Sequence, residues 1–401
     1  MTLRVLHVIP SVSPVRGGPS KAIFEMAASL QDSHDTEVEI ATTNDDGPDL
    51  LDVPLNQKIF YNGVNVWFFP RFSPKIAPVR EFAFSFNLTK WLWENIQNYD
   101  LVHVHAIFSY PSTIAMAIAR QKSVPYIVRP LGQLCEWSLA QSAQRKKIYL
   151  ALAERKNLNG CNQVHLTSRQ EQEEFNKLDL KSSSFILPHG LNVSSKIFDA
   201  RNLLRAHFQL PTDEPVILFL SRIHPKKGLD YLIPALKSIA DKRFTFILAG
   251  NGDPAYEEKV RELIHTNGLQ DRIIMPGFIE GRLKELLLQG SDIFALTSYS
   301  ENFGVAVLEA LAAGTPALVT PGVALAHEVK EHQLGYVVPQ NNADIAKALC
   351  TYLESPAEAK NSLSRRASEF VSAHYSWTRI AKELNVIYQN ILTNKSTFDY
   401  A

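Results

Sequence analysis

The chain has 401 residues, of which 45% are hydrophobic and 20% charged, and its 41 basic and 41 acidic side chains give a formal net charge of zero at pH 7. This composition is typical of a globular protein with two or three domains and a large core. The balanced charge excludes an overall attraction to nucleic acid or to an anionic membrane surface.

The number of cysteines and the sequence of the N-terminus bear on the cellular compartment of the protein. Cys135, Cys161 and Cys350 are few, odd in number and far apart, which argues against a disulfide framework and against a zinc site made of cysteines. The apolar run at 3–9 is too short for a signal peptide, and no apolar stretch of about 18 residues follows. We therefore expect a soluble, cytoplasmic protein whose membrane contact would be peripheral, at the inner face of the membrane.

The first half of the chain alternates short β-rich runs with helical patterns. The expected strands are 3–9, 37–43, 64–69, 101–106, 126–131, 163–168 and 184–187. Strand and helix in alternation predict a mainly parallel sheet that is covered on both faces.

The same alternation restarts after Pro188, with expected strands at 216–221, 244–249, 273–275, 293–297 and 317–320. The sequence thus predicts an α/β protein of two doubly wound, Rossmann-like domains, 1–188 and 189–375, and a last helix, 376–401, that crosses back onto the first domain. Because ligands of such sheets bind beyond the carboxyl ends of the strands, we expect the site in a cleft between facing domains.

Two features of the first domain suit a ligand. Gly17 and Gly18 follow the first strand, where paired glycines either let a phosphate or a sugar approach the backbone or form a plain loop. His103 and His105 lie in one strand and point to one face. No third ligand group accompanies them in the sequence, so we expect buried histidines and no metal, with only His105 near enough to the strand end to contact a ligand.

In the second domain, the segment after strand 216–221 carries Arg222, Lys226 and Lys227. Cations at the carboxyl edge of a sheet neutralise a pyrophosphate, although a solvated basic turn has the same composition. The chain has neither a Walker A sequence nor a dinucleotide fingerprint, and no Asp-x-Asp pair that would hold a metal on a diphosphate. If a diphosphate leaves, Arg222 and Lys227 must compensate its charge.

Glu301 and Glu309 have seven residues between them, including Gly304. The pattern predicts a helix that Asn302 caps, with the amides of Phe303, Gly304 and Val305 available to a phosphate or a sugar hydroxyl. One carboxylate at each end of this amide-rich segment matches a nucleotide sugar, in which a hexose and a ribose lie on either side of a pyrophosphate. The alternative is a surface helix with two solvated acids, but a glycine in the first turn is costly for a merely structural helix.

Two segments of the first domain combine aromatic or apolar residues with cations. Segment 82–96 contains three phenylalanines and two tryptophans, and segment 144–159 contains five basic residues. Each is either a core or domain-face helix, or a peripheral membrane helix that lets a lipid-linked acceptor approach.

These residues resemble family 4 of the retaining glycosyltransferases with the GT-B fold, over nearly the whole chain. The resemblance rests on the segment from Glu301 to Glu309, on Ser221-Arg222 and Lys227-Gly228, on Gly17-Gly18 and on the interdomain segment 188–192. Where the family often has Asn, this chain has His189. The segment from Arg129 to Leu134 resembles members that build bacterial polysaccharides, which marks Arg129 as an acceptor-side residue.

The resemblance implies a role for each matching residue. Glu301 would bind hexose hydroxyls, Arg222 and Lys227 would hold the diphosphate, and His105 would approach the donor hexose from the other domain. The nucleotide sugar would also meet Gly17, Gly18, Gly277, Phe278, Asn302, Phe303, Gly304, Val305 and Glu309. Among these, Glu309 would bind the ribose, and Gly277 and Phe278 would approach the base.

The implied reaction is metal-independent transfer of a hexose, with retention, from a nucleotide diphosphate sugar. UDP-glucose is the favoured donor, and the acceptor is a saccharide or lipid-linked saccharide of polysaccharide or glycolipid synthesis. The leaving phosphate would accept the proton of the acceptor, so neither a protein base nor a cofactor is required. The alternatives are a sugar-nucleotide epimerase on the same fold and a non-catalytic protein that binds sugar nucleotides.

Overall fold

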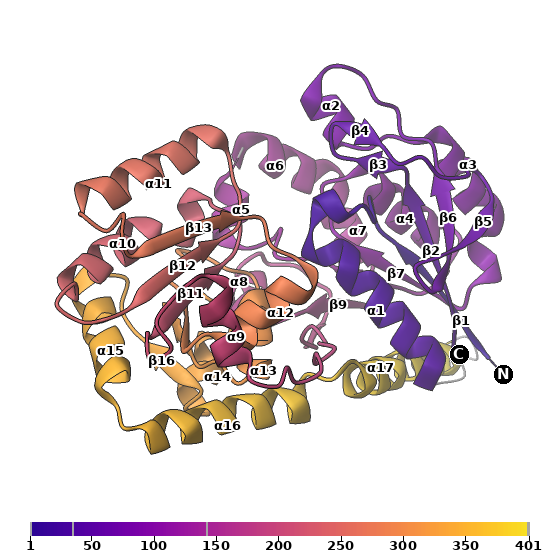
Figure 1. Cartoon of the computed structure of the whole chain (residues 1–401). Coiled ribbons are helices and arrows are strands. Elements are labelled where there is room, and N and C mark those ends of the chain that lie inside the picture. Colours follow the sequence, from indigo (N-terminus) through magenta and orange to yellow (C-terminus); the bar gives the residue numbers. More distant parts are fainter. Residues whose placement is uncertain (1, 34–35, 142, 399–401) are drawn as a thin grey trace. The chain divides into compact units, whose positions relative to one another are not determined.

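The protein is described by a computed structural model that covers residues 2–33, 36–141 and 143–398. It consists of two compact units, which Figure 1 labels by their helices and strands. Unit 1 comprises Met1–Gly190 and Trp377–Ala401, and unit 2 comprises Leu191–Ser376. These divisions lie two residues and one residue from the boundaries expected at 188/189 and 375/376.

Unit 1 is built on an eight-stranded sheet in the order β10-β9-β8-β7-β1-β2-β6-β5. Its strands are β1 (Leu3–Val8), β2 (Thr36–Thr43), β5 (Lys58–Tyr61), β6 (Val64–Phe69), β7 (Leu101–His105), β8 (Tyr126–Arg129), β9 (Gln163–Leu166) and β10 (Ser184–Ile186). All neighbours pair in parallel except β5 with β6. A two-stranded hairpin, β3 (Asp45–Asp46) and β4 (Asp49–Leu50), stands apart from this sheet.

Helices cover both faces of this sheet. They are α1 (Gly18–Ser33), α2 (Ala77–Glu81), α3 (Phe86–Asn95), α4 (Tyr110–Gln121), α5 (Glu136–Ala140), α6 (Ala143–Tyr149), α7 (Arg155–Asn159), α8 (Arg169–Asn176) and α17 (Trp377–Phe398). Because successive strand residues point to opposite faces, Val5 packs with α1 and α17, whereas Leu6 packs with α3 and α4. Each face of the sheet thus has its own hydrophobic core.

The C-terminal helix α17 belongs to unit 1, as the sequence predicts. Its buried side chains recur every three or four residues and face α1 and the sheet; they are Trp377, Ile380, Leu384, Tyr388 and Ile391. The indole of Trp377 also donates a hydrogen bond of 2.8 Å to the carboxylate of Glu25 on α1.

Unit 2 contains a six-stranded parallel sheet in the order β13-β12-β11-β14-β15-β16. The strands are β11 (Val216–Leu220), β12 (Thr245–Ala249), β13 (Ile273–Gly277), β14 (Ile293–Leu296), β15 (Ala317–Val319) and β16 (Gly335–Val337). The helices are α9 (Ala200–His207), α10 (Leu229–Ser238), α11 (Pro254–Thr266), α12 (Gly281–Gly290), α13 (Val305–Ala312), α14 (Ala326–Glu331), α15 (Asn342–Glu354) and α16 (Ala357–His374). The predicted pair of doubly wound sheets is therefore confirmed.

Segments 82–96 and 144–159, which the sequence suggested as core or membrane-contacting helices, differ in continuity: the first is interrupted, whereas the second is helical over the whole of 144–159. Phe82 ends α2, Ala83 has a left-handed φ of 57°, and α3 begins only after its N-cap Ser85. In the second segment, a π-helical turn, η3 (Leu150–Glu154), joins α6 to α7 within one run of helical residues. Within the described residues, no helix is both long enough and apolar enough to cross a membrane.

Candidate functional site

The strand order of unit 2 gathers its polar loops at one edge. Strands β11 and β14 are neighbours, yet the chain leaves β11 towards β12 and leaves β14 towards β15, on opposite sides. At such a point the helices that follow the two strands diverge, and the space beyond the carboxyl ends is open to a ligand. Arg222 and Lys227 follow β11 and Glu301 follows β14, so the topology brings these predicted residues to one place.

Glycines let these loops pack against one another. A Cβ atom on Gly228, whose φ is 69°, would lie 2.0 Å from the carbonyl oxygen of Thr297. A Cβ atom on Gly250 would lie 1.9 Å from the carbonyl oxygen of Ser221. These glycines are therefore required for close backbone packing.

An ion pair joins the loops that follow β11 and β14. The ammonium group of Lys227 donates to a carboxylate oxygen of Glu301, and their side chains are 11% and 21% exposed. Arg222 is exposed and has no hydrogen bond or ion pair with any residue that the structure describes. At this edge Lys227 is thus a compensated cation, and Arg222 is a cation available to an anionic ligand.

The electrostatics of the loop after β11 are also visible at His224. Partial burial lowers the pKa of this histidine first, and the positive charges of Arg222, Lys227 and Lys226 lower it further. Three cations act on one imidazole, so the loop is a region of positive potential.

The helix between the two glutamates starts later than predicted. Asn302 is not its cap; the helix α13 begins at Val305, and Gly304 occupies the N-cap position with a left-handed φ of 86°. A residue with a Cβ atom is strained in this conformation, which explains the glycine. Glu309 therefore lies only one turn into the helix, and its carboxylate accepts a hydrogen bond of 2.7 Å from Lys284 on α12.

The residues around Gly304 divide into core and accessible groups. Phe303 belongs to the core, because the residue is 3% exposed and the centroid of its ring lies 6.2 Å from that of Tyr375. The side-chain oxygen of Asn302 is buried without a hydrogen-bond partner among the described residues. A buried acceptor without a partner is costly and indicates a site that a donor group can complete.

Gly277 and Phe278, at the end of β13, lie at the far side of the same edge. Gly277 has a φ of 81°, its carbonyl accepts a hydrogen bond of 2.7 Å from Gly250, and an added Cβ atom would meet nothing within 4 Å. Phe278 is 65% exposed. An exposed aromatic ring after a strand end provides a stacking surface, although no described contact joins it to Glu301 or Lys227.

In unit 1, the structure adds a third histidine to the two that the sequence identified. His7 on β1 pairs in register with His103 on the neighbouring strand β7. Donor nitrogens of His7, His103 and His105 lie within 4.8 Å of one another, and all three side chains are buried. The expectation that no third possible ligand accompanies His103 and His105 is therefore wrong, because strand order cannot be read from spacing.

This cluster fits a metal ion poorly. His103 uses both ring nitrogens, one with Tyr388 at 2.7 Å and one with His165 at 3.3 Å, and His7 Nδ1 is 2.9 Å from His105 Nε2. The guanidinium of Arg129 is buried nearby, and its charge lowers the pKa of His7, His103 and His105 further after burial has done so. A second cation would be repelled there.

The loop after β7 is held in a strained conformation. Ala106 and Phe108 both have left-handed φ values, of 65° and 56°. The amide of Ile107 donates to the side chain of Gln133 at 2.6 Å, and that of Phe108 donates to Glu154 at 3.2 Å. Burial raises the pKa of Glu154. Strain of this kind clusters at ligand sites. Gln133 and Glu154 lie in the segments 129–134 and 144–159 that the sequence singled out, but neither was predicted as a site residue.

The glycine loop after β1 is held in place by Arg16, the residue before Gly17. Arg16 donates to Asp45 at 2.7 Å and 2.8 Å and to Glu81 at 2.7 Å, and the hydrogen bond to Asp45 raises the pKa of Arg16. Gly17 has a φ of 77°, and a Cβ atom on Gly17 or Gly18 would meet nothing within 4 Å. The loop is thus fixed at its base and open at its two glycines, as close ligand approach requires.

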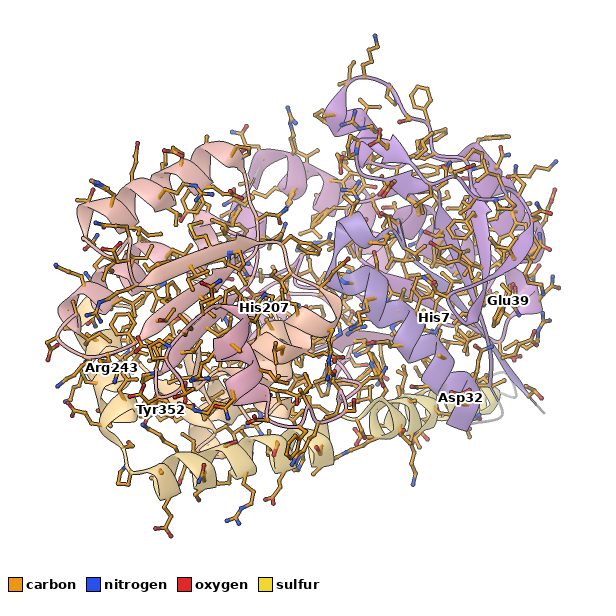
Figure 2. All side chains as sticks on the ribbon, viewed as in Figure 1. His7, Asp32, Glu39, His207, Arg243 and Tyr352 are labelled. Atoms are coloured by element: carbon orange, nitrogen blue, oxygen red, sulfur yellow. The ribbon has the colours of Figure 1, made fainter. Side chains whose placement is uncertain are left out.

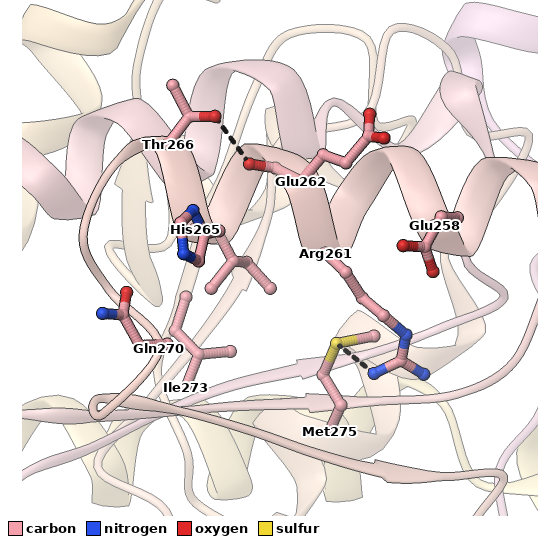
Figure 3. A pocket seen from close by; sticks show the side chains of 9 residues that line it. Glu258, Arg261, Glu262, His265, Thr266, Gln270, Ile273 and Met275 are labelled. Carbon is pink, nitrogen blue, oxygen red and sulfur yellow. Dashed lines mark hydrogen bonds between the residues drawn. The ribbon is translucent and has the colours of Figure 1, made fainter.

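A hollow of about 660 Å³ lies elsewhere in unit 2, along α11 and the edge strand β13 (Figure 3). It is lined by Glu258, Arg261, Glu262, Ile264, His265, Thr266, Gln270, Ile273 and Met275. None of the predicted site residues lines it. Its walls are one helix and an edge strand rather than the loops at the carboxyl ends, so we do not assign the ligand site to it.

Two protein families match the chain, one in each unit. Residues 17–184 match the family described as "Glycosyl transferase 4-like domain", and residues 200–370 match "Glycosyl transferases group 1". The chain is a GT-B glycosyltransferase of the family 4 type. The two matches together include every predicted site residue, and they agree with the resemblance inferred from the Glu301–Glu309 segment.

Relatives of this glycosyltransferase carry related names. An uncharacterized glycosyltransferase of Methanocaldococcus jannaschii is 32% identical over 179 residues, which are 44% of this chain and 45% of that protein. A D-inositol 3-phosphate glycosyltransferase of Xylanimonas cellulosilytica is 24% identical over 93% of this chain and 91% of its own. The first match thus spans less than half of either protein, whereas the second spans nearly all of both.

Solved structures share the fold of the glycosyltransferase. Sucrose-phosphate synthase from Thermosynechococcus elongatus superposes with a TM-score of 0.79 at 21% identity, covering 98% of this chain and all of its own. The Anabaena protein HepE, solved in complex with UDP and glucose, superposes with a TM-score of 0.73 at 18% identity, covering 97% of this chain and all of its own. At these identities, the similarity shows the fold alone.

Proposed function

We propose that the glycosyltransferase moves a hexose from a nucleotide diphosphate sugar, UDP-glucose being favoured, to a saccharide or lipid-linked saccharide acceptor, with retention and without a metal. The proposal is carried by the ion pair of Lys227 with Glu301 beside Arg222, at the carboxyl edge where β11 and β14 diverge. Cations and a carboxylate at one point match a sugar diphosphate, which has an anionic part and a hydroxylated part.

In the proposed reaction, the bond between the hexose and the diphosphate breaks as the acceptor oxygen bonds to the hexose. Arg222 and Lys227 stabilise the negative charge that develops on the leaving diphosphate. The backbone at Phe303, Gly304 and Val305 and the side chain of Asn302 supply further polar groups, Glu301 accepts from hexose hydroxyls, and Glu309 accepts from the ribose. The leaving phosphate takes the acceptor's proton, so no side chain acts as base.

Support for the donor and its assignment comes from two directions. HepE, which shares the fold, was solved with UDP and glucose, and the relative from Xylanimonas cellulosilytica is named for an inositol phosphate acceptor. In this chain, we propose that Gly277 and Phe278 contact the base, and that Gly17, Gly18 and His105 contact the donor from unit 1. The three glycines have open space where a Cβ atom would be, and the ring of Phe278 is exposed, whereas His105 is buried at the end of β7.

The experiment that tests the donor is calorimetric titration with UDP, GDP and ADP in the presence of a chelator. We expect metal-free binding of UDP that weakens at least about tenfold in Arg222→Ala, since a charge-assisted hydrogen bond is lost. Arg243→Ala is the matched control, because Arg243 is exposed and precedes β12, at the amino edge of the same sheet (Figure 2). Binding of UDP only with magnesium, or equal loss in both variants, would contradict the proposal.

We also propose that unit 1 contacts a membrane surface through segments 82–96 and 144–159. Phe86 and Trp93, seven residues apart on α3, are 67% and 45% exposed, and Leu152 is 79% exposed near Lys146 and Lys147. Exposed apolar side chains beside cations are the composition of a peripheral contact. Cosedimentation with anionic lipid vesicles tests this proposal. We expect the parent protein to sediment with the vesicles and the double variant Phe86→Ser, Trp93→Ser to stay in solution. Equal sedimentation of the two proteins would exclude a role of these side chains in membrane contact.

A further inference from the structure

Unit 1 contains a buried network of imidazoles that no step of the proposed reaction uses in full. His7 on β1, His103 and His105 on β7 and His165 on β9 are all at most 1% exposed, and Figure 2 labels His7 within this unit. Burial lowers the pKa of each, so all four are neutral at physiological pH. A neutral imidazole has one N–H donor and one bare nitrogen acceptor, so each hydrogen bond constrains the next.

The first chain of hydrogen bonds has a fixed direction. The carbonyl of Leu187 can only accept, so His165 donates to it from Nε2 at 2.8 Å. His165 Nδ1 is then bare and accepts from His103 Nε2 at 3.3 Å. His103 Nδ1 is bare in turn and accepts from the hydroxyl of Tyr388 at 2.7 Å. One backbone carbonyl therefore sets the tautomers of two histidines.

The second chain has two possible directions. His7 Nδ1 and His105 Nε2 are 2.9 Å apart, and either can donate. His7 Nε2 is buried and has no partner among the described residues. If His105 donates, His7 must carry its proton on Nε2, as a buried N–H without an acceptor. If His7 donates from Nδ1, then Nε2 is a bare nitrogen and the free N–H is that of His105 Nδ1. This atom is not among the buried described atoms that lack a partner, so no buried N–H is orphaned in this direction.

A buried charge also lies nearby. Arg129 is on β8, and its Nε has no partner among the described residues. Its charge lowers the pKa of both His7 and His105 after burial has done so, which keeps both imidazoles neutral but does not choose between the two directions. The placement of the proton of His7 on Nδ1 therefore rests on the hydrogen bonds.

We infer that His7 fixes His105 as the tautomer that carries its proton on Nδ1, so that His105 donates a hydrogen bond to an oxygen of the sugar donor. His105 Nε2 is occupied by His7, and no hydrogen bond to His105 Nδ1 occurs within the described ranges. His7 is a positioning residue that acts through His105. The second half of the inference rests on the proposed function, whereas the tautomer is a property of the ligand-free protein.

The inference also limits what His105 can do. A nitrogen that already carries a proton cannot accept another, so His105 cannot be a base for the acceptor through Nδ1. It can recognise a hydroxyl, a phosphate or a carbonyl oxygen, because each of these accepts a hydrogen bond. The hydrogen bond from His7 therefore leaves His105 Nδ1 able to donate a hydrogen bond but not to accept one.

The tautomer is measured by long-range proton–nitrogen NMR on protein labelled with 15N in its histidines, at pH 7.5 and without ligand. Bare and protonated ring nitrogens have distinct nitrogen shifts, and the His105 signals are assigned as those missing from His105→Gln. We expect His105 to be protonated on Nδ1 and bare on Nε2. A proton on Nε2, or on both nitrogens, would overturn the inference.

Two variants of similar size test the role of His7. In His7→Asn the side-chain amide keeps a donor at the place of Nδ1, whereas in His7→Leu the donor is lost. We expect His7→Asn to retain the His105 tautomer, and His7→Leu to lose it and to raise the KM for the sugar donor about tenfold with a smaller change in kcat. Circular dichroism establishes that both variants fold. Equal kinetics and equal His105 spectra in the two folded variants would reject His7 as a positioning residue.

The two hypotheses fail in different ways. If the parent protein shows the expected tautomer but neither binds nor turns over any nucleotide sugar, the tautomer assignment stands and the proposed function is wrong. If it transfers a sugar while His105 is protonated on Nε2, the proposed function stands and the inference is wrong.

Discussion

Lys227 and Glu301 form an ion pair although 73 residues separate them in the sequence, because β11 and β14 lie side by side and each residue follows the carboxyl end of its strand. Each side chain keeps some contact with solvent, so a ligand can replace the partner of either one. The pairing of a cation for phosphate with a carboxylate for hydroxyls means that the two proposed subsites adjoin.

Glu301→Gln tests the hydroxyl subsite. Removing the charged acceptor that we assign to the hexose should lower kcat/KM for transfer by about 100-fold or more. Because the ion pair with Lys227 is only partly buried, we expect the free energy of unfolding to change by no more than about 1 kcal/mol. Glu354→Gln, which removes an exposed carboxylate paired with Lys242 at 2.8 Å, is the control. Near-normal turnover of Glu301→Gln would refute the assignment.

Glu309 and Lys284 offer a test of the ribose subsite. If Glu309 binds ribose hydroxyls, Glu309→Gln should weaken both UDP and uridine by about tenfold, whereas Arg222→Ala should weaken UDP alone. Lys284→Met should have a smaller effect, because Lys284 orients the Glu309 carboxylate through a 2.7 Å hydrogen bond. Calorimetric titration with the two ligands gives all the dissociation constants. Unchanged uridine binding by Glu309→Gln would exclude the ribose role.

Gly304→Ala separates backbone strain from crowding. Its left-handed φ should cost about 1 kcal/mol with any Cβ atom, and that atom would lie 3.3 Å from Val323, so we expect a loss of about 2 kcal/mol in total. Gly281→Ala is a matched comparison, since Gly281 has a φ of 57° and nothing within 4 Å of the added atom. Urea unfolding of both variants measures the difference. Equal losses would mean that Val323 yields without cost.

The sequence was informative where function depends on strand ends. The apolar runs before Arg222 and Glu301 predicted strands whose observed ends differ by one residue, and the loops after them carry the cations and the carboxylate. Strand β5 was missed because it is a half-exposed antiparallel edge strand, and β16 because it is a short, partly exposed edge strand that begins with a glycine. The helix start was misplaced because a left-handed glycine, rather than the asparagine, precedes α13.

Residue partnerships were much harder to predict. Lys284 lies on α12 without any motif, so its contact with Glu309 could not be found by spacing. His7 meets His103 only because β1 and β7 are neighbours, a fact of strand order that hydrophobic periodicity does not contain. Tyr388 reaches His103 from the other end of the chain. The sequence thus indicated which residue types surround a ligand better than it indicated what orients them.

The buried histidines predict that acid destabilises unit 1 selectively. Burial lowers the pKa of His7 to about 3, and it lowers the pKa of His103, His105, His165 and His189 well below the usual value. Below about pH 6.5 the histidines are protonated in the unfolded chain but not in the folded unit. The free energy of unfolding therefore falls as the pH falls. Each such histidine contributes about 1.4 kcal/mol per pH unit in that range, and nothing above it.

Tryptophan fluorescence can follow this unit alone, because all 5 tryptophans of the chain lie in unit 1. We expect the urea midpoint to be nearly constant from pH 8 to 7 and to fall steeply below pH 6. His189→Asn should make the fall shallower by about one proton, since it removes one titrating group and leaves an oxygen to accept from Arg129. His207→Gln, at an exposed position in unit 2, should leave the profile unchanged. A midpoint independent of pH between 7 and 5 would show that the histidines are charged, or solvated, in the folded protein.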